Sequence, residues 1–130
     1  KIVEFFKLNN IKNIKLPVSA PFHCKLMNKA TDVMKKEIQK MKFQDGENTL
    51  ISNVTAEEVN QKDKLKELLI DQIENRVRWR ESVIKMLDNG VNNFIEIGPG
   101  KVLSGLVKRI DKSVKINTIN SVSDIQEIRI

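Results

Sequence analysis

Residues 93–119, NFIEIGPGKVLSGLVKRIDKSVKINTI, contain the clearest structural pattern in the chain. The short apolar run at 93–97 predicts a buried strand, and the glycines and proline at 98–100 predict a turn. Apolar residues at three- and four-residue steps then predict a helix as far as Ile110, and a second β-branched run at 114–119 predicts another strand. Two strands joined by a helix predict a right-handed crossover and parallel pairing.

The same alternation extends towards the amino terminus. We expect a short helix, a strand, a long helix, a strand and two helices in succession, at residues 2–9, 14–18, 25–41, 49–54, around 65–73 and around 79–87. After the first helix the order is β-α-β-α-α-β-α-β. This order predicts an α/β fold with a largely parallel sheet that helices cover on both faces.

The composition excludes several classes of protein. The chain has 130 residues, of which 40% are hydrophobic and 31% charged, so a disordered tail and a coiled coil are disfavoured. Its single cysteine excludes a disulfide scaffold and a thiolate zinc cluster, and fits a reducing cytoplasm. No apolar run approaches the roughly 20 residues that span a bilayer, so no membrane segment is expected.

The charge points to an acidic partner. Lysine and arginine number 23 against 17 acidic residues, which gives a net charge of +6. A nucleic-acid-binding protein is expected to carry exposed aromatic residues among its basic residues, but aromatics make up 5% of the chain and tyrosine is absent. Nucleic-acid binding is therefore disfavoured, and an acidic protein or a phosphorylated molecule is the expected partner.

Three separate segments follow predicted strands. They are residues 19–24, with the sequence SAPFHC, then Asn53, and then Gly98–Lys101. Because ligands of parallel α/β sheets bind beyond the carboxyl ends of the strands, we expect these segments to converge on one rim.

The only histidine, His23, stands between a predicted strand and the longest predicted helix. A lone histidine is often structural or merely exposed. The partial positive charge of a helix amino terminus, however, disfavours imidazolium, so His23 there would be a neutral base near neutral pH. The adjacent Cys24 is expected to be a small packing residue rather than the nucleophile of a Cys-His pair.

The segment Gly98-Pro99-Gly100-Lys101 does not match known phosphate-binding loops. One residue separates its glycines where a Walker loop has four, and Leu103 stands where a dinucleotide fingerprint requires glycine. A tight turn that lets helix and sheet pack closely is one interpretation, and contact with a ligand is the other.

Four segments together resemble one enzyme family, the malonyl-CoA:acyl carrier protein transacylases of bacterial fatty-acid synthesis, in its carboxyl-terminal part. They are LPVSAPFHCKLM, SNVTA, DQIENRVRW and FIEIGPGKVLSGLVKRI, at residues 16–27, 52–56, 71–79 and 94–110. The resemblance implies an acyltransferase that moves a malonyl group from coenzyme A to the phosphopantetheine thiol of acyl carrier protein through an acyl-serine. It implies no cofactor and no metal.

The resemblance also implies a fold and a role for particular residues. Residues 1–17 would be the last helix and strand of a small ferredoxin-like subdomain, and residues 18–130 the carboxyl-terminal part of a hydrolase-like subdomain with a three-layer parallel sheet. His23 would be the acid-base residue, oriented by a backbone carbonyl rather than an acid, and the family's matching glutamine falls on Gln72. Gln72, together with Asn53 at the end of the second predicted strand, is expected to bind the substrate or shape its site. The chain departs from the family pattern at Glu74 and Arg76, where tyrosine and proline are common.

The nucleophile of that reaction is not in the chain. No G-x-S-x-G occurs in the 130 residues, and the first residue is Lys1 within a helical pattern that has no capping residue before it. We therefore expect a fragment that is inactive alone and that partners with the amino-terminal half of the same protein. The alternative is a non-catalytic module that retains the fold and docks carrier proteins.

Overall fold

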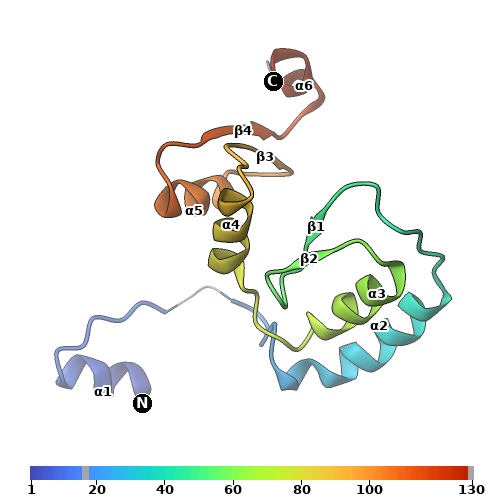
Figure 1. The fold of residues 1–130 in the computed structure, drawn as a ribbon. Coiled ribbons are helices and arrows are strands. Elements are labelled where there is room, and N and C mark those ends of the chain that lie inside the picture. Colours follow the sequence, from blue (N-terminus) through green and yellow to red (C-terminus); the bar gives the residue numbers. More distant parts are fainter. Residues whose placement is uncertain (16–17, 129–130) are drawn as a thin grey trace.

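The computed structural model describes residues 1–15 and 18–128. It combines helices with short strands (Figure 1). In order, they are α1 (Ile2–Leu8), η1 (Lys25–Met27), α2 (Asn28–Lys40), β1 (Leu50–Ile51), β2 (Glu58–Val59), α3 (Lys62–Asp71), α4 (Trp79–Asp88), β3 (Asn93–Ile97), α5 (Val102–Ile110), β4 (Lys115–Ile119) and α6 (Val122–Glu127). The expected α/β class is confirmed.

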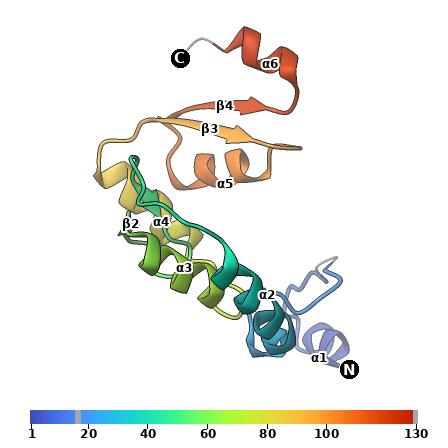
Figure 2. The same ribbon diagram turned by 90° about the vertical axis from the view of Figure 1, so that its right-hand side faces the viewer.

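The carboxyl-terminal third forms the predicted β-α-β unit. Strands β3 and β4 pair in parallel, with Asn93 opposite Lys115 and Ile97 opposite Ile119. Helix α5 connects them and lies on one side of the pair, whereas α6 lies on the other side (Figure 2). Antiparallel strands can join through a short turn, but a parallel pair needs such a crossover.

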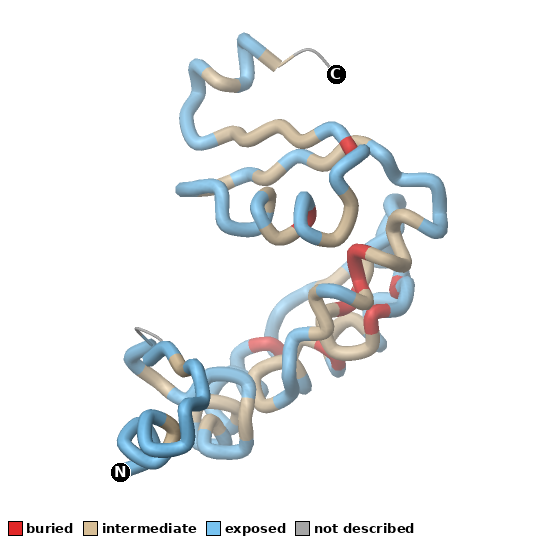
Figure 3. Tube along the Cα trace, turned by 90° about the vertical axis from the view of Figure 1, so that its left-hand side faces the viewer, coloured by how far each residue is buried: buried red, intermediate tan, exposed pale blue. Residues whose placement is uncertain are grey.

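The hydrophobic core lies between α4, α5 and this strand pair. Val83, Val107 and Val114 are 0%, 3% and 4% exposed, and larger side chains such as Trp79 and Phe94 pack around them. The other buried side chains of the described residues lie in α2, α3, α4 and the β1–β2 segment (Figure 3). Three β-branched side chains, from α4, from α5 and from the residue just before β4, thus hold the β-α-β unit against α4.

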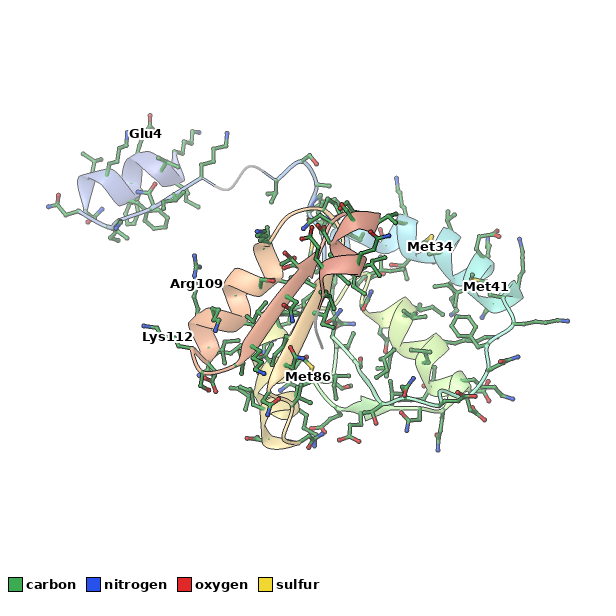
Figure 4. The ribbon with its side chains drawn as sticks, turned by 90° about the horizontal axis from the view of Figure 1, so that it is seen from above. Glu4, Met34, Met41, Met86, Arg109 and Lys112 are labelled. Atoms are coloured by element: carbon green, nitrogen blue, oxygen red, sulfur yellow. The ribbon has the colours of Figure 1, made fainter. Side chains whose placement is uncertain are left out.

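The end of α5 is basic and faces outward. Figure 4 shows Arg109 in the last turn of α5 and Lys112 just beyond it, both pointing away from the strands. Positive side chains at this position interact favourably with the partial negative charge of the helix carboxyl terminus.

Strand β1 differs from the expectation of a longer strand at 49–54 within the parallel sheet. It comprises only Leu50 and Ile51, and it pairs antiparallel with β2. The reason is a tight loop at residues 52–57: the Ser52 hydroxyl accepts the Val54 amide at 3.2 Å, and Ala56 has a φ of +59°. A serine turn and a left-handed residue reverse the chain before a longer strand can form.

The long helix predicted at 25–41 is confirmed, with a 3₁₀ first turn. Cys24 is extended and gives no side-chain cap, so the chain enters through η1 before continuing as α2. Helix α2 packs against α3, and each contributes one buried apolar side chain, Ile38 and Leu68.

The two ends of the chain differ in their agreement with the sequence patterns. Helix α1 forms as predicted but has no buried residue. The strand expected at 14–18 includes residues 16–17, which lie outside the described residues. Helix α6 was not predicted, although Ser121 and Asp124 form a capping box at its start. No helix among the described residues is long and apolar enough to cross a membrane.

Candidate active site

The imidazole of His23 is held by a backbone carbonyl. Its Nδ1 atom lies 2.7 Å from the carbonyl oxygen of Gln72. A carbonyl oxygen can only accept a hydrogen bond, so in the neutral ring Nδ1 carries the proton and donates it. The lone pair then remains on Nε2, the nitrogen that can take a proton from another group.

The Gln72 carbonyl is available because α3 ends beside it. The last carbonyls of a helix have no partner within the helix. The carbonyl of Asp71 accepts two hydrogen bonds from Asn75, one from the backbone amide at 3.0 Å and one from the side-chain amide at 2.7 Å. The next carbonyl, that of Gln72, accepts the hydrogen bond from His23 Nδ1.

His23 adopts an uncommon backbone conformation. Its φ is +58°, in the left-handed region where non-glycine residues are infrequent. Such a conformation costs on the order of 1 kcal/mol and is concentrated at functional sites. The neighbouring Cys24 donates its thiol to the carbonyl of Pro21 at 3.2 Å rather than to the imidazole. This bond is in keeping with a packing role for Cys24.

Asn53 and Gln72 line the same small cavity. Its volume is about 240 Å³, and the other lining residues come from β1, the loop after it and α3. Asn53 lies in the loop rather than at the end of a strand, because β1 already ends at Ile51. Gln72 thus contacts His23 through its backbone carbonyl and shares a cavity with Asn53, whereas His23 is not among the residues that line this cavity.

The Gly98–Lys101 turn is bonded to a different part of the chain. Gly98 and Gly100 have positive φ angles of 135° and 94°, which glycine adopts without strain. The Gly98 amide donates to the Ile119 carbonyl at 2.9 Å, and the Gly100 amide donates to the Asn120 side chain at 2.6 Å. These bonds favour the tight-turn interpretation, and they tie this segment to the end of β4 rather than to His23.

The carboxylate of Glu96, a residue of β3, lies at the amino terminus of α5. This carboxylate accepts the Ser104 amide at 2.7 Å and the Leu103 amide at 3.1 Å. Hydrogen bonds from Ser104, and then from Leu103, hold the pKa of the Glu96 carboxyl below its usual range. The amides that a phosphate would use are therefore already bound. No sequence pattern predicted this role, although Glu96 is the only charged residue of the strand at 93–97.

The described residues hold no candidate metal centre. Within residues 1–15 and 18–128, no group of three or more histidine, cysteine, aspartate or glutamate side chains is arranged to bind an ion.

Comparison with known proteins identifies a family. The chain is 41% identical over 124 residues to a malonyl CoA-acyl carrier protein transacylase of Bacillus subtilis, a match that covers 95% of the chain and 39% of that protein. It superimposes on an acyl-carrier-protein S-malonyltransferase from Bartonella henselae with a TM-score of 0.85 and 38% identity, covering 96% of the chain and 40% of that structure. The resemblance to the malonyl-CoA:acyl carrier protein transacylases is confirmed. No family model matches the chain.

A second similar structure contains a partner. It is a malonyl-transacylase in complex with its type II polyketide acyl-carrier protein, and it matches 92% of this chain at 31% identity, with a TM-score of 0.81 and 39% of that structure covered. The chain therefore spans about two fifths of the length of the relatives it matches. The α/β fold with a parallel strand pair agrees with this family.

Proposed function

We propose that this chain forms the carboxyl-terminal part of a malonyl-CoA:acyl carrier protein transacylase and supplies the acid-base histidine of its active site. The observation that carries the proposal is the hydrogen bond from His23 Nδ1 to the Gln72 carbonyl at 2.7 Å. This bond leaves Nε2 as the proton acceptor of the site without a carboxylate partner, which is the arrangement that the family resemblance implies.

The reaction proceeds in two transfers. A serine hydroxyl attacks the malonyl thioester of coenzyme A, and its proton passes to His23 Nε2. The thiolate of coenzyme A leaves and takes that proton from His23, so that malonyl remains as an ester on the serine. The phosphopantetheine thiol of the carrier protein then gives its proton to Nε2 and attacks the ester. His23 finally returns the proton to the serine oxygen.

The Gln72 carbonyl has two effects in this mechanism. It fixes the tautomer and the direction of the ring, and its partial negative charge stabilises the imidazolium that forms twice in each cycle. Asn53, which shares a cavity with Gln72, shapes the substrate side of the same site.

The serine is supplied by the amino-terminal part of the protein, which lies outside this chain. Large apolar side chains on several elements support this part of the proposal, because they are exposed here and need a covering surface. Leu26 is 75% exposed and Ile97 is 78% exposed. A cavity of about 450 Å³, lined in part by Ile51, Trp79 and Met86, provides a further apolar surface for the same contact.

We further propose the division into subdomains that the family resemblance implies. Residues 1–17 belong to a small ferredoxin-like subdomain, and residues 18–130 to a hydrolase-like subdomain with a three-layer parallel sheet. The position of α1 supports this division, because it has no buried residue and stands apart from the remaining elements (Figure 1).

The partners of the proposed enzyme are malonyl-CoA and an acyl carrier protein in the cytoplasm. The net charge of +6 is complementary to an acidic carrier. The relative whose structure includes its acyl-carrier protein gives independent support.

Complementation tests this function. The coding sequence upstream of Lys1 is expected to encode a G-x-S-x-G motif. The chain alone should transfer no malonyl group from malonyl-CoA to acyl carrier protein, and the chain mixed with the separately produced upstream part should transfer it. An upstream sequence without that motif would instead favour a carrier-docking module, and transfer by the chain alone would contradict the assignment of the nucleophile to the upstream part.

A further inference from the structure

Arg78 joins two segments that are distant in sequence. Its backbone amide donates to the Asn53 carbonyl at 2.8 Å, and its Nη1 donates to the Thr55 carbonyl at 2.8 Å. Both acceptors belong to the loop at 52–57 between β1 and β2. Arg78 itself is the residue that precedes α4.

The neighbouring basic residue lacks these contacts. Arg76 is 78% exposed at its side chain, and its hydrogen bond goes to Glu81 at 3.2 Å. The Arg78 side chain is 39% exposed; it contacts Glu81 at 3.3 Å as well as the loop carbonyl. Exposed ion pairs contribute little to stability, so the contact with the loop is what distinguishes Arg78.

Residues 72–78 connect α3 to α4, and this connection begins at the candidate active site. Gln72, six residues earlier, binds His23 through its carbonyl and lines a cavity together with Asn53. Arg78 thus attaches the Asn53 loop to the connection between α3 and α4, at the opposite end from Gln72. A planar guanidinium can hold a carbonyl and a carboxylate at once, which an ammonium does with less directional control.

We propose that Arg78 is a positioning residue that fixes the Asn53 loop beside Gln72 and His23. The inference about the loop concerns this chain alone, whereas its consequence for the rate of transfer rests on the proposed function. Arg78 acts through the loop and makes no contact with the reacting atoms in this account.

Hydrogen exchange tests the positioning in the 130-residue chain. In Arg78→Ala, the amide of residue 78 should exchange about tenfold faster than in the wild type, because the side-chain bond that holds its acceptor loop is lost. Arg78→Lys should give a smaller acceleration. Arg80→Ala removes an exposed arginine of the same helix and should leave this amide unchanged. Unchanged exchange in Arg78→Ala would overturn the proposal. If Arg78→Ala does not fold, the partial effect of Arg78→Lys decides the matter in the same assay.

A double-mutant cycle tests the functional consequence in the complete protein. Arg78→Ala should lower the rate of malonyl transfer, and adding it to Asn53→Ala should lower the rate little further, because both act through the same loop. Losses that simply add would contradict positioning through Asn53. If Asn53→Ala alone leaves the rate unchanged, the proposed role of Asn53 fails, and the exchange measurement still decides whether Arg78 holds the loop.

Discussion

The Nδ1 atom of His23 and the carbonyl oxygen of Gln72 lie 2.7 Å apart, although the two residues are 49 positions apart in the sequence. His23 lies in the turn before η1, and Gln72 immediately follows α3. Their contact fixes which nitrogen of the ring holds the proton and so determines which nitrogen can act as a base.

The tautomer of His23 is open to direct measurement. Because His23 is the only histidine in the chain, its ring nitrogens can be assigned without ambiguity by NMR. At about pH 9, where an ordinary imidazole is neutral, the proton should reside on Nδ1. Gln72→Ala keeps the backbone carbonyl and should keep this tautomer. A predominantly Nε2-protonated ring in the wild-type chain would show that the hydrogen bond does not form in solution.

The contact between His23 and Gln72 was predictable from the sequence only through family resemblance. The position of His23 between a strand and a helix pattern indicated a neutral base, but no periodicity links it to Gln72. The backbone atom that makes the bond carries no residue-specific signal, since every residue has a carbonyl. Sequence patterns identify side chains, and here the partner is main chain.

The β-α-β unit at 93–119 was predictable because its pattern is local. Strand β3 spans the predicted residues, and α5 and β4 follow within one or two residues of expectation. Strand β1 was overestimated because its β-branched content continues into Val54 and Thr55, whereas the Ser52 hydroxyl turns the backbone there. Competition between a side-chain hydrogen bond and strand propensity is not visible in a hydrophobic pattern.

Glu96 should stabilise the fold in a pH-dependent way. Its pKa is lower in the folded chain than its ordinary value of 4.5, so its contribution is present above that value and is lost as the pH falls through the folded pKa. Glu96→Gln should therefore lower the free energy of unfolding at neutral pH, and the difference from the wild type should shrink in acid. Glu47→Gln, in an exposed loop, is the matched control. Equal urea midpoints for Glu96→Gln and wild type at neutral pH would refute the capping role.

The core depends most on Val83, whose side chain has no exposed surface. Val83→Ala removes two methyl groups from a packed position and should lower the free energy of unfolding by about 2 kcal/mol. Val33→Ala makes the same change on α2, where the side chain is 61% exposed, and should cost less than about 0.5 kcal/mol. Urea denaturation measures both, and similar losses for the two variants would be inconsistent with this core.

Capture of the carrier protein should depend on salt. Lys25, Lys29 and Lys101 are exposed and would attract an acidic carrier. Raising the ionic strength from low to physiological values should slow malonyl transfer to the carrier more than transfer to a small thiol acceptor, because screening acts on the charged partner. Lys25→Glu with Lys29→Glu should reduce the difference between the two acceptors. Equal salt dependence for both acceptors would exclude electrostatic docking through these lysines.

His23 is proposed to move the proton in malonyl transfer, and the transfer rate of His23→Ala in the complete protein tests this role. This variant should fold and should lose about 10² to 10⁴-fold in rate, the usual contribution of a positioned acid-base group. Cys24→Ala, at the adjacent position, should retain most of the rate, since the Cys24 thiol bonds to the Pro21 carbonyl. A folded His23→Ala protein that transfers malonyl groups at nearly the wild-type rate would show that His23 is not the acid-base residue.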